Sequence, residues 1–548
     1  MNDPYASNFA YNYPLLIKNI LSFPLQFNEN QEIVSINETR FDYKQLFLRI
    51  KKLSDSLLKI GVKKGNTIGV MNWDCHRYLE CFFSIPIIGS IIHTINVRLS
   101  NEQILYTINN AENDYIIVHS DFVDVINSIS SRFNKPVKII VIDDKNNSNN
   151  FKLNEKIRSK YDYESLIVDG NKTFHFPDFD ENTLATRFYT TGTTGEPKGV
   201  TYSHRQLVLH TLAVMAGMGS FASDSRLHKD DIYMPITPMF HVHGWGFPYV
   251  ATLMGIKQVY PGKFDPEIIL NLIINEKVSF THCVPTILNM LLTSAKSKKL
   301  KFDNLKMIIG GAALSHGLAK NALENGINVF SAYGMSETCP FVSVAEVPKK
   351  LENDNQFIEE RCVTGKPAPL VEIRVVDQQM NDIERGGNNT GEIVIRSPWL
   401  TQGYVKDQEA SDQLWENGYM HTGDVGYIDH DGSLKITDRL KDVIKSGGEW
   451  ISSLELENFI SECEDVSEVA VISIESIKWG ERPIAIIVSS KNPIDVEKSI
   501  NNLFEKAFLE GRLPKWSKPD KMIFSNQLDK TSVGKINKKL LRQKYKTN

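Results

Sequence analysis

The segment from Tyr189 to Val200 reads Tyr-Thr-Thr-Gly-Thr-Thr-Gly-Glu-Pro-Lys-Gly-Val and carries the strongest chemical signal in the chain. Its glycines let the backbone approach a bulky anion, its threonine hydroxyls can donate hydrogen bonds, and Lys198 adds a compact positive charge. The segment is not a Walker phosphate loop, because Pro197 precedes the lysine and no Ser or Thr follows it. A flexible surface loop is the alternative, but strand-like apolar segments on both sides favour a polyphosphate site.

Two further segments carry groups that suit a nucleotide. In Tyr333-Gly-Met-Ser-Glu337, the tyrosine offers a flat face for a base, and the Ser and Glu oxygens are ligands that magnesium takes beside phosphates. Asp424 follows a glycine turn and can accept hydrogen bonds from a ribose diol. Taken alone, each segment is equally compatible with an ordinary charged turn.

Other segments have competing interpretations. The fingerprint-like run from Gly217 to Ala222 follows a helical pattern and opens no strand-turn-helix unit, so a dinucleotide site is not expected there. His241 and His243 have no third metal ligand at a suitable spacing. Alternation along an extended segment would put both imidazoles on one side, which favours a pocket-lining role. Small residues at Gly310–Ala313 allow either a ligand or a packed helix to come close.

Together, and in this order, these segments resemble the adenylate-forming superfamily of acyl-CoA synthetases, peptide-synthetase adenylation domains and firefly-type luciferases. The resemblance spans nearly the whole chain, from Phe41-Asp-Tyr-Lys44 to Thr531-Ser-Val-Gly-Lys535. The segments 238–245 and 444–453 are most similar to medium- and long-chain fatty-acyl-CoA synthetases. Amino-acid adenylation domains usually carry an Asp near the first of these segments, and His241 stands here instead, which disfavours an amino-acid substrate.

The resemblance implies a two-step reaction with ATP, Mg²⁺ and coenzyme A: an acid becomes acyl-AMP with release of pyrophosphate, and a thiol then displaces AMP. It implies catalytic roles for Lys535, Glu337 and Lys198, with magnesium at Thr190 and Glu337. The ATP- or AMP-binding residues that it implies are Thr190, Thr191, Gly192, Thr193, Thr194, Gly195, Lys198, Gly311, Ala312, Ala332, Tyr333, Gly334, Ser336, Asp424, Arg439, Lys441, Lys445 and Trp450. The acyl pocket that it implies consists of His241, Val242, Trp245 and Gly311, and the residues that it implies for CoA transfer are Gly447, Gly448 and Glu449.

Two positions depart from the family pattern. Ala332 stands where a glycine often precedes the adenine-stacking aromatic residue, which narrows the expected nucleotide pocket slightly. Asp529 stands before Lys535 where a proline is common, which puts the stiffness of that loop in doubt but leaves the lysine assignment unchanged.

The elements that must position these residues follow from the hydrophobic pattern. Runs rich in Ile and Val alternate with helical patterns and predict an α/β fold with helices on the faces of sheets; the runs are 67–71, 115–118, 137–142 and 307–309. Asp429-His-Asp-Gly432 predicts a hairpin turn. The resemblance implies a large adenylation domain of layered sheets and helices at 1–440. It implies a small mobile α+β lid at 441–548, which turns about a hinge near Lys441 between the two half-reactions.

Composition limits the function classes. The chain has 548 residues, a net charge of -4, and 41% hydrophobic against 23% charged residues, which is typical of a soluble globular protein with no nucleic-acid partner. Its six cysteines form no Cys-x-x-Cys pair, which argues against zinc and disulfides and favours a reducing compartment. No signal peptide or membrane-spanning segment is evident, so we expect a cytoplasmic protein. Peripheral membrane contact and a homodimer both stay open.

Three function classes stay in view: a CoA ligase, a luciferase-type oxygenase, and an enzyme that loads a carrier protein. The Gly-Gly-Glu-Trp segment at 447–450 favours the CoA ligase. The expected substrate is a medium- or long-chain fatty acid, and a short, branched or thioether-containing acid is the alternative.

Overall fold

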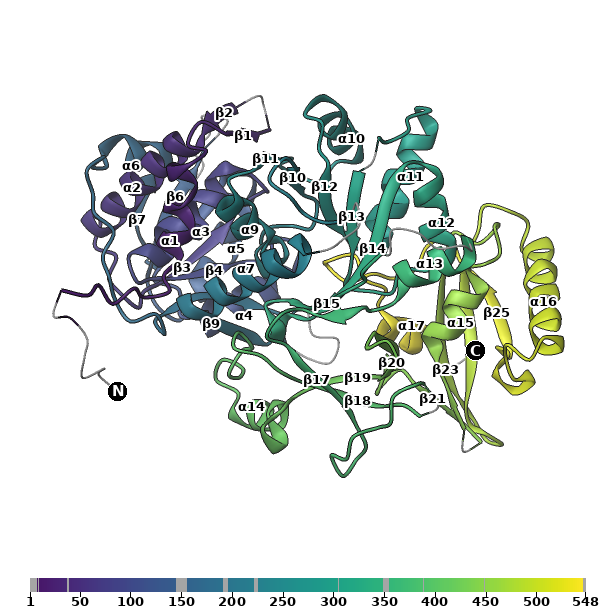
Figure 1. Ribbon diagram of the computed structural model, residues 1–548. Helices are drawn as coiled ribbons and strands as arrows, with labels where there is room; N and C mark the ends of the chain where they lie inside the picture. Colours follow the sequence, from purple (N-terminus) through teal and green to yellow (C-terminus); the bar gives the residue numbers. More distant parts are fainter. Residues whose placement is uncertain are drawn as a thin grey trace.

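The computed structural model describes residues 7, 9–36, 39–143, 155–190, 196–220, 225–303, 305–347, 354–387, 389–447 and 449–545. Two large sheets lie side by side in the first three quarters of the chain, with a four-stranded sheet beneath them and a separate C-terminal unit at one end (Figure 1). The predicted α/β class is confirmed.

The first large sheet has seven strands in the order β7-β6-β5-β3-β4-β8-β9. Its strands are β3 (Thr67–Met71), β4 (Ile91–Thr94), β5 (Tyr115–His119), β6 (Val137–Ile142), β7 (Ile157–Asp162), β8 (Leu184–Tyr189) and β9 (Gly199–Ser203). Neighbouring strands are parallel except β8 and β9, which pair antiparallel. The phosphate-type segment therefore connects two adjacent strands and emerges where β8 ends.

The second large sheet has nine strands in the order β16-β15-β14-β13-β12-β10-β11-β1-β2. They are β1 (Glu32–Ser35), β2 (Thr39–Asp42), β10 (Ile232–Pro235), β11 (Lys257–Tyr260), β12 (Phe280–Cys283), β13 (Leu305–Ile309), β14 (Ile327–Gly334), β15 (Phe341–Val344) and β16 (Lys366–Pro367). Its central strands from β1 to β14 run parallel, so their carboxyl ends share one edge. Open parallel sheets place ligands at that edge.

Helices cover the faces of both sheets (Figure 1). They are α1 (Ile17–Ser22), α2 (Tyr43–Lys59), α3 (His76–Ile87), α4 (Asn101–Asn110), α5 (Val123–Ile129), α6 (Tyr163–Asp169), α7 (His204–Gly219), α8 (Val242–Trp245), α9 (Phe247–Met254), α10 (Pro266–Asn275), α11 (Pro285–Ser297), α12 (His316–Glu324) and α13 (Asp354–Cys362). Local sequence fixes several helix starts. Asp42 with Gln45 and Ser203 with Gln206 form capping boxes, which satisfy backbone N–H groups at the first turns of α2 and α7.

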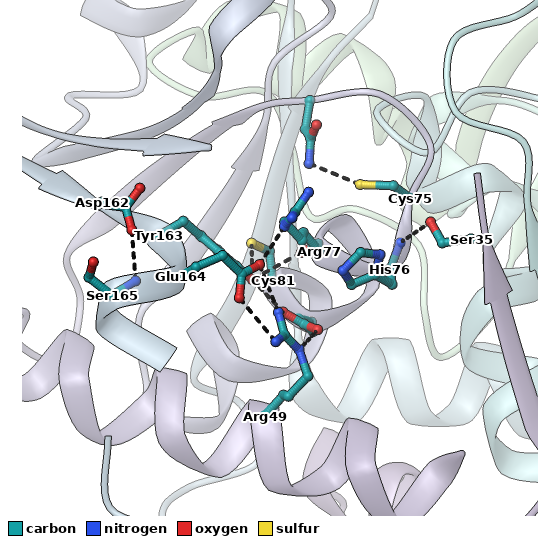
Figure 2. Close-up of polar contacts among 12 residues, drawn as sticks. Ser35, Arg49, Cys75, His76, Arg77, Cys81, Asp162, Tyr163, Glu164 and Ser165 are labelled. Carbon is teal, nitrogen blue, oxygen red and sulfur yellow. Dashed lines mark hydrogen bonds and ion pairs between the residues drawn. The ribbon is translucent and has the colours of Figure 1, made fainter. Parts of the chain in front are cut away.

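A buried ionic cluster ties α2, α3 and α6 together (Figure 2). The fully buried Glu80 accepts hydrogen bonds from Arg49 Nε at 2.6 Å and from the Tyr163 hydroxyl at 2.7 Å. Glu164 accepts from Arg49 and from Arg77 Nε. Arg49 thus neutralises the buried Glu80, as a buried charge requires, and Arg49 and Arg77 both pair with the partly exposed Glu164. The cluster fixes α3 against the sheet that carries the phosphate-type segment.

The smaller four-stranded sheet is antiparallel and consists of β17 (Glu372–Val376), β18 (Gly391–Arg396), β19 (Met420–Ile428) and β20 (Leu434–Arg439). The helix α14 (Gln408–Leu414) and a short 3-10 helix (Glu416–Gly418) lie between β18 and β19 in sequence. The predicted turn at Asp429–Gly432 joins β19 to β20 and is confirmed. Gly432 adopts φ of 88° there, a conformation that favours glycine.

The C-terminal unit, which we call the lid, has its own sheet of β21 (Ile444–Ser446), β22 (Glu449–Ile451), β23 (Glu468–Ser476), β24 (Gly480–Val488) and β25 (Lys521–Phe524). Its helices are α15 (Ser453–Ile460), α16 (Pro493–Leu509) and α17 (Lys538–Tyr545). The lid encloses a separate hydrophobic core. The yellow chain between β25 and α17 returns from the lid to the middle of the molecule, beside β13 and β14 (Figure 1).

Candidate functional site

The two ends of the phosphate-type segment are hydrogen-bonded to each other. The Thr190 N–H donates to the Lys198 carbonyl at 2.8 Å, and the Thr190 hydroxyl accepts from the Lys198 N–H at 3.3 Å. The Lys198 ammonium lies 4.6 Å from the centre of the Tyr404 ring and 3.8 Å from Asp407 Oδ2. The predicted residues Thr191, Gly192, Thr193, Thr194 and Gly195 lie outside the described residues. The two described ends of the segment therefore lie together, and the Lys198 ammonium lies beside Tyr404 and Asp407.

Tyr404 links Lys198, at the end of this segment, to Glu337. Its hydroxyl donates to Glu337 Oε1 at 2.8 Å, while the Glu337 carbonyl accepts from the Thr401 N–H at 3.0 Å. The Glu337 side chain is buried and therefore held in one orientation. The sequence interpretation did not identify Tyr404, because a Gly-Tyr pair in a connecting segment is too common to stand out.

The side-chain oxygens of Glu337 and Thr190 are of the kind that binds magnesium. A carboxylate at Glu337 and a hydroxyl at Thr190 are hard ligands, and Mg²⁺ is typically held by one or two such groups together with substrate phosphates and water. Among the described residues, no three or more His, Cys, Asp or Glu side chains gather into a metal cluster.

The residues predicted for the nucleoside come together where the ends of β14 and β20 meet the middle of β19. The Tyr333 hydroxyl donates to Asp424 Oδ2 at 2.6 Å, and Arg439 Nε lies 2.9 Å from Asp424 Oδ1. Burial, reinforced by the Asp424 carboxylate, raises the pKa of Tyr333 well above its usual range. An aromatic ring, a carboxylate and a guanidinium thus meet at one point, a set that can hold a base and a ribose.

The chain around Tyr333 is tightly constrained. A Cβ at Gly334 would lie 1.7 Å from the Pro340 carbonyl oxygen, so only glycine fits there. Ala332 packs against a hydrophobic cluster beneath the site, and the Ser336 carbonyl accepts a hydrogen bond from the Tyr202 hydroxyl. These contacts fix the tyrosine ring relative to the sheet edge.

The Lys535 side chain extends from the lid to the group formed by Tyr333, Asp424 and Arg439. A Cβ at Gly311, whose φ is 78°, would lie 2.8 Å from Lys535 Cε. Burial, with a contribution from the nearby Arg439, lowers the pKa of Lys535 to about 8, while Asp424 and Glu337 oppose the shift. The neighbouring Ala312 is exposed. The structure therefore brings together Lys535, Gly311, Asp424 and Glu337, which are far apart in sequence.

Contacts across the domain boundary hold the Lys535 loop in place. The Thr286 hydroxyl donates to the Gly534 carbonyl at 2.7 Å, and Asn96 Nδ2 donates to the Ser532 hydroxyl at 3.1 Å. The sequence interpretation did not identify Thr286 or Asn96. No motif marks them, since their role depends only on where the returning chain docks.

The expectation that His241 and His243 lie on one side of an extended segment was wrong. Residues Val242 to Gly246 all have positive φ, from 48° to 77°, and form a left-handed turn. His243 turns inward, where its Nε2 lies 2.7 Å from the Thr186 hydroxyl. His241 lies near Arg98 and Lys535, and burial lowers its pKa to about 3. A run of left-handed residues outside glycine is strained, which is why periodicity did not predict it.

Trp245, at the end of this turn, is buried over the edge of β12 and β13. Its ring stacks on the His282 ring at 5.0 Å with an angle of 26° between the planes. A Cβ at Gly310 would lie 3.1 Å from the indole, so the glycine makes room for it. Val242, also predicted for the acyl pocket, is buried in the adjoining core. Trp245 therefore fills the space beside Gly310, and its role in an acyl pocket stays a prediction.

The residues assigned to CoA transfer lie on the hairpin of β21 and β22. The Gly447 N–H donates to the Trp479 carbonyl at 2.7 Å, and the Lys445 N–H donates to Glu481 Oε2 at 2.8 Å. Glu449 is exposed. Gly448 and the Trp450 side chain lie outside the described residues. Because these contacts are with the lid itself, the roles of this hairpin in AMP binding and CoA transfer stay predictions.

Comparison with known proteins agrees with this geometry. AMP-binding enzymes match residues 25–405, and the C-terminal domain of AMP-binding enzymes matches residues 455–535. The chain therefore belongs to the AMP-binding enzyme family, and within it to the adenylate-forming acyl-CoA synthetases.

Individual relatives are similar over almost their full length. A long-chain-fatty-acid–CoA ligase of Thermus thermophilus is 35% identical over 526 residues, covering 94% of this chain and 93% of that protein. A 3-methylmercaptopropionyl-CoA ligase of Ruegeria lacuscaerulensis is 34% identical over 550 residues, covering 97% of this chain and 98% of that protein. The crystal structure of the anthranilate CoA ligase AuaEII in complex with anthranoyl-AMP gives a TM-score of 0.85 at 21% identity and covers 98% of both chains, which supports the fold.

Replacing Glu337 with Gln should raise the Mg²⁺ concentration needed for half-maximal pyrophosphate release, because the amide oxygen is a weaker ligand for a hard cation. The measurement is a Mg²⁺ titration at saturating ATP. Glu392→Gln is a matched control, since that carboxylate bonds His421 and the Gly423 N–H within the four-stranded sheet. Superimposable curves for Glu337→Gln and the parent would assign Glu337 a structural role only.

Replacing Lys535 with Ala should slow acyl-adenylate formation by about a hundred- to a thousand-fold, the effect of removing one group that stabilises transition-state charge. Thioester formation from supplied acyl-AMP should be largely spared. The two half-reactions are measured separately, by pyrophosphate release and by CoA consumption. Equal losses in both would contradict the assignment.

The pH profile gives a second readout for this lysine. Because the pKa of Lys535 is lowered to about 8, its charged form is lost as the pH rises through that value, and kcat/KM for adenylation should fall above it. A guanidinium stays protonated throughout this range, so Lys535→Arg should lose the alkaline fall even if its rate is low. An unchanged profile in this variant would assign the fall to another group.

Proposed function

We propose that this protein activates an apolar medium- or long-chain carboxylic acid and transfers it to coenzyme A. ATP and the acid give acyl-AMP and pyrophosphate, and CoA then gives acyl-CoA and AMP. This proposal rests on one observation: Lys535 of the lid lies beside Asp424, Arg439 and Glu337 of the large domain. Nucleotide binding alone does not require a buried lysine from a second domain beside these residues.

The residues explain how the first step is assisted. An acid oxygen attacks the α-phosphorus of ATP while the bond to pyrophosphate breaks, so negative charge builds on phosphate oxygens. Lys535 and Lys198 supply positive charge at the two ends of the site, and Mg²⁺ held beside Glu337 and Thr190 supplies further neutralisation. Asp424 accepts hydrogen bonds from the ribose, and Tyr333 packs on the adenine. Positioning and charge, rather than a covalent enzyme intermediate, carry the reaction.

The second step needs the thiol to reach the same carbonyl that Lys535 now faces. We propose that the lid turns about Lys441 after pyrophosphate leaves, withdrawing the Lys535 loop and presenting Gly447, Gly448 and Glu449. Lys441, whose pKa is lowered by burial and by Arg439, lies at the junction of the two units. This motion gates access to the intermediate.

A short thioether acid is the second candidate substrate. Two observations favour it: Trp245 fills the space beside Gly310, and one relative of similar identity is a 3-methylmercaptopropionyl-CoA ligase. In that case Trp245 is a fixed wall that limits the length of the acid. For a medium- or long-chain acid, Trp245 would instead be a gate that swings aside to admit the acyl chain, as in the long-chain synthetases that the sequence resembles. A luciferase-type oxygenase and a carrier-loading enzyme have no comparable support.

A substrate screen tests the proposal. Pyrophosphate release is measured with straight-chain acids of two to eighteen carbons and with 3-(methylthio)propionate, followed by AMP release with and without CoA. We expect activity with the longer acids and AMP release that depends on CoA. Adenylation without transfer to free CoA, or light emission in place of thioester formation, would reject the CoA ligase assignment.

We propose a cytoplasmic location, supported by six cysteines that are all free. Among the described residues, no helix is long and apolar enough to cross a membrane. The partners are the acid, ATP and CoA. Peripheral membrane contact and a homodimer are further proposals that the sequence left open.

Trp245→Ala distinguishes a gate from a wall. If Trp245 is a gate, the parent's kcat/KM should already rise with chain length by about fourfold per buried methylene, the equivalent of about 0.8 kcal/mol, and the variant should change this slope little. The measurement is kcat/KM against chain length for both proteins, with Trp516→Ala on the lid as a control. A parent optimum at four carbons or fewer that moves to longer acids in Trp245→Ala would establish the wall.

A further inference from the structure

The connection between the large domain and the lid is bracketed by contacts on both sides. On the large-domain side, the Leu440 N–H donates to the Gly423 carbonyl at 3.0 Å, one residue after Arg439 pairs with Asp424. On the lid side, Asp442 Oδ1 accepts from Arg542 Nη2 of α17 at 2.5 Å. Lys441 alone lies between these anchors. Any rotation of the lid must therefore occur close to this residue.

A second set of contacts crosses the boundary beside the pivot. Asp438, at the end of β20, accepts hydrogen bonds from the Ser453 N–H at 2.6 Å and from the Ser453 hydroxyl at 2.7 Å. The Ser452 hydroxyl donates to the Thr437 carbonyl. Ser452 and Ser453 begin α15 of the lid, whereas Thr437 and Asp438 belong to the four-stranded sheet. These bonds hold the lid helix to the large domain in the orientation that buries Lys535.

The Asp438 carboxylate depends on these donors. Its side chain is 1% exposed, and its other oxygen accepts from the Arg439 N–H at 2.7 Å. The Lys538 ammonium completes the group, bonding the Ser453 hydroxyl at 2.7 Å and pairing with Glu457 at 2.7 Å. A buried carboxylate that loses its donors must regain water or an equivalent partner. Rotation about Lys441 moves Ser453 away, so this group cannot be satisfied in the same way in both orientations.

We propose that Asp438 and Ser453 form a latch that holds the lid in the adenylation orientation and opens before thioester formation. The proposal rests on the proposed function, in which one lid serves two half-reactions. Asp438 and Ser453 are positioning residues, since they act through Lys535 and touch no substrate. Asp442 and Arg542 both lie on the lid side of the pivot and would move together, so their ion pair does not favour one lid orientation over the other.

Ser453→Ala removes the hydroxyl donor and keeps the backbone. We expect adenylation of decanoate to fall about tenfold, the effect of one lost hydrogen bond to a charged group, while thioester formation from supplied decanoyl-AMP stays the same or rises. Ser453→Thr should restore the parent ratio of the two rates. Ser517→Ala is the matched control, because that buried hydroxyl bonds the Pro514 carbonyl inside the lid.

A measurement independent of substrate accompanies the rates. Trypsin should cleave after Lys441 or Lys445 several-fold faster in the full-length Ser453→Ala protein than in the parent or Ser517→Ala, because an unlatched lid exposes the connection. Equal loss of both half-reactions, or no change in the rate ratio and in cleavage, would overturn the latch. Failure of the parent to form decanoyl-CoA would count against the proposed substrate, and the cleavage rates would still decide the latch.

Discussion

The buried ammonium of Lys535 is the constraint on which the rest of the site depends. Taking a lysine out of water is costly unless negative charge lies close to it. Asp424 and Glu337 supply part of that charge, but Arg439 lies nearby and acts against it, which leaves the pKa of Lys535 at about 8. In the reaction we propose, a bound triphosphate would supply the missing negative charge. We therefore expect docking of the lid and binding of the nucleotide to stabilise each other.

The sheets explain why these groups can meet. The phosphate-type segment leaves β8 in one sheet, Gly311 follows β13 in the other, and Tyr333 lies at the end of β14. Asp424 and Arg439 face each other across paired strands β19 and β20. Tyr333, Asp424 and Arg439 lie within strands rather than on a long loop, so their positions are set by backbone hydrogen bonds. Lys535 is the group that comes from the lid, and in our proposal it is the one that withdraws.

Much of this could be predicted from the sequence, for identifiable reasons. Buried parallel strands read as runs of Ile and Val, so β3 and β6 were predicted with their observed bounds, and the Asp-Gly turn before β20 was equally clear. Tyr333 and Asp424 were predicted from the chemistry of their side chains, and Lys535 from the resemblance to the family. Tyr404 and Thr286 were not, because their roles arise from tertiary contacts that leave no local pattern. The left-handed turn at 242–246 was misread as extended, since alternation assumes ordinary backbone angles.

The single residue between the two anchored segments also limits the kinds of motion available to the lid. A long flexible linker would let the lid tumble in every direction, and each return to the site would require a search over all orientations. Here the contacts at Leu440 and Asp442 confine the proposed rotation to the backbone around Lys441, where the Asp442 and Val443 N–H groups also donate to the Arg439 carbonyl. A lid that rotates as we propose would therefore have few degrees of freedom, and we expect each closure to cost less conformational entropy than it would with a long linker.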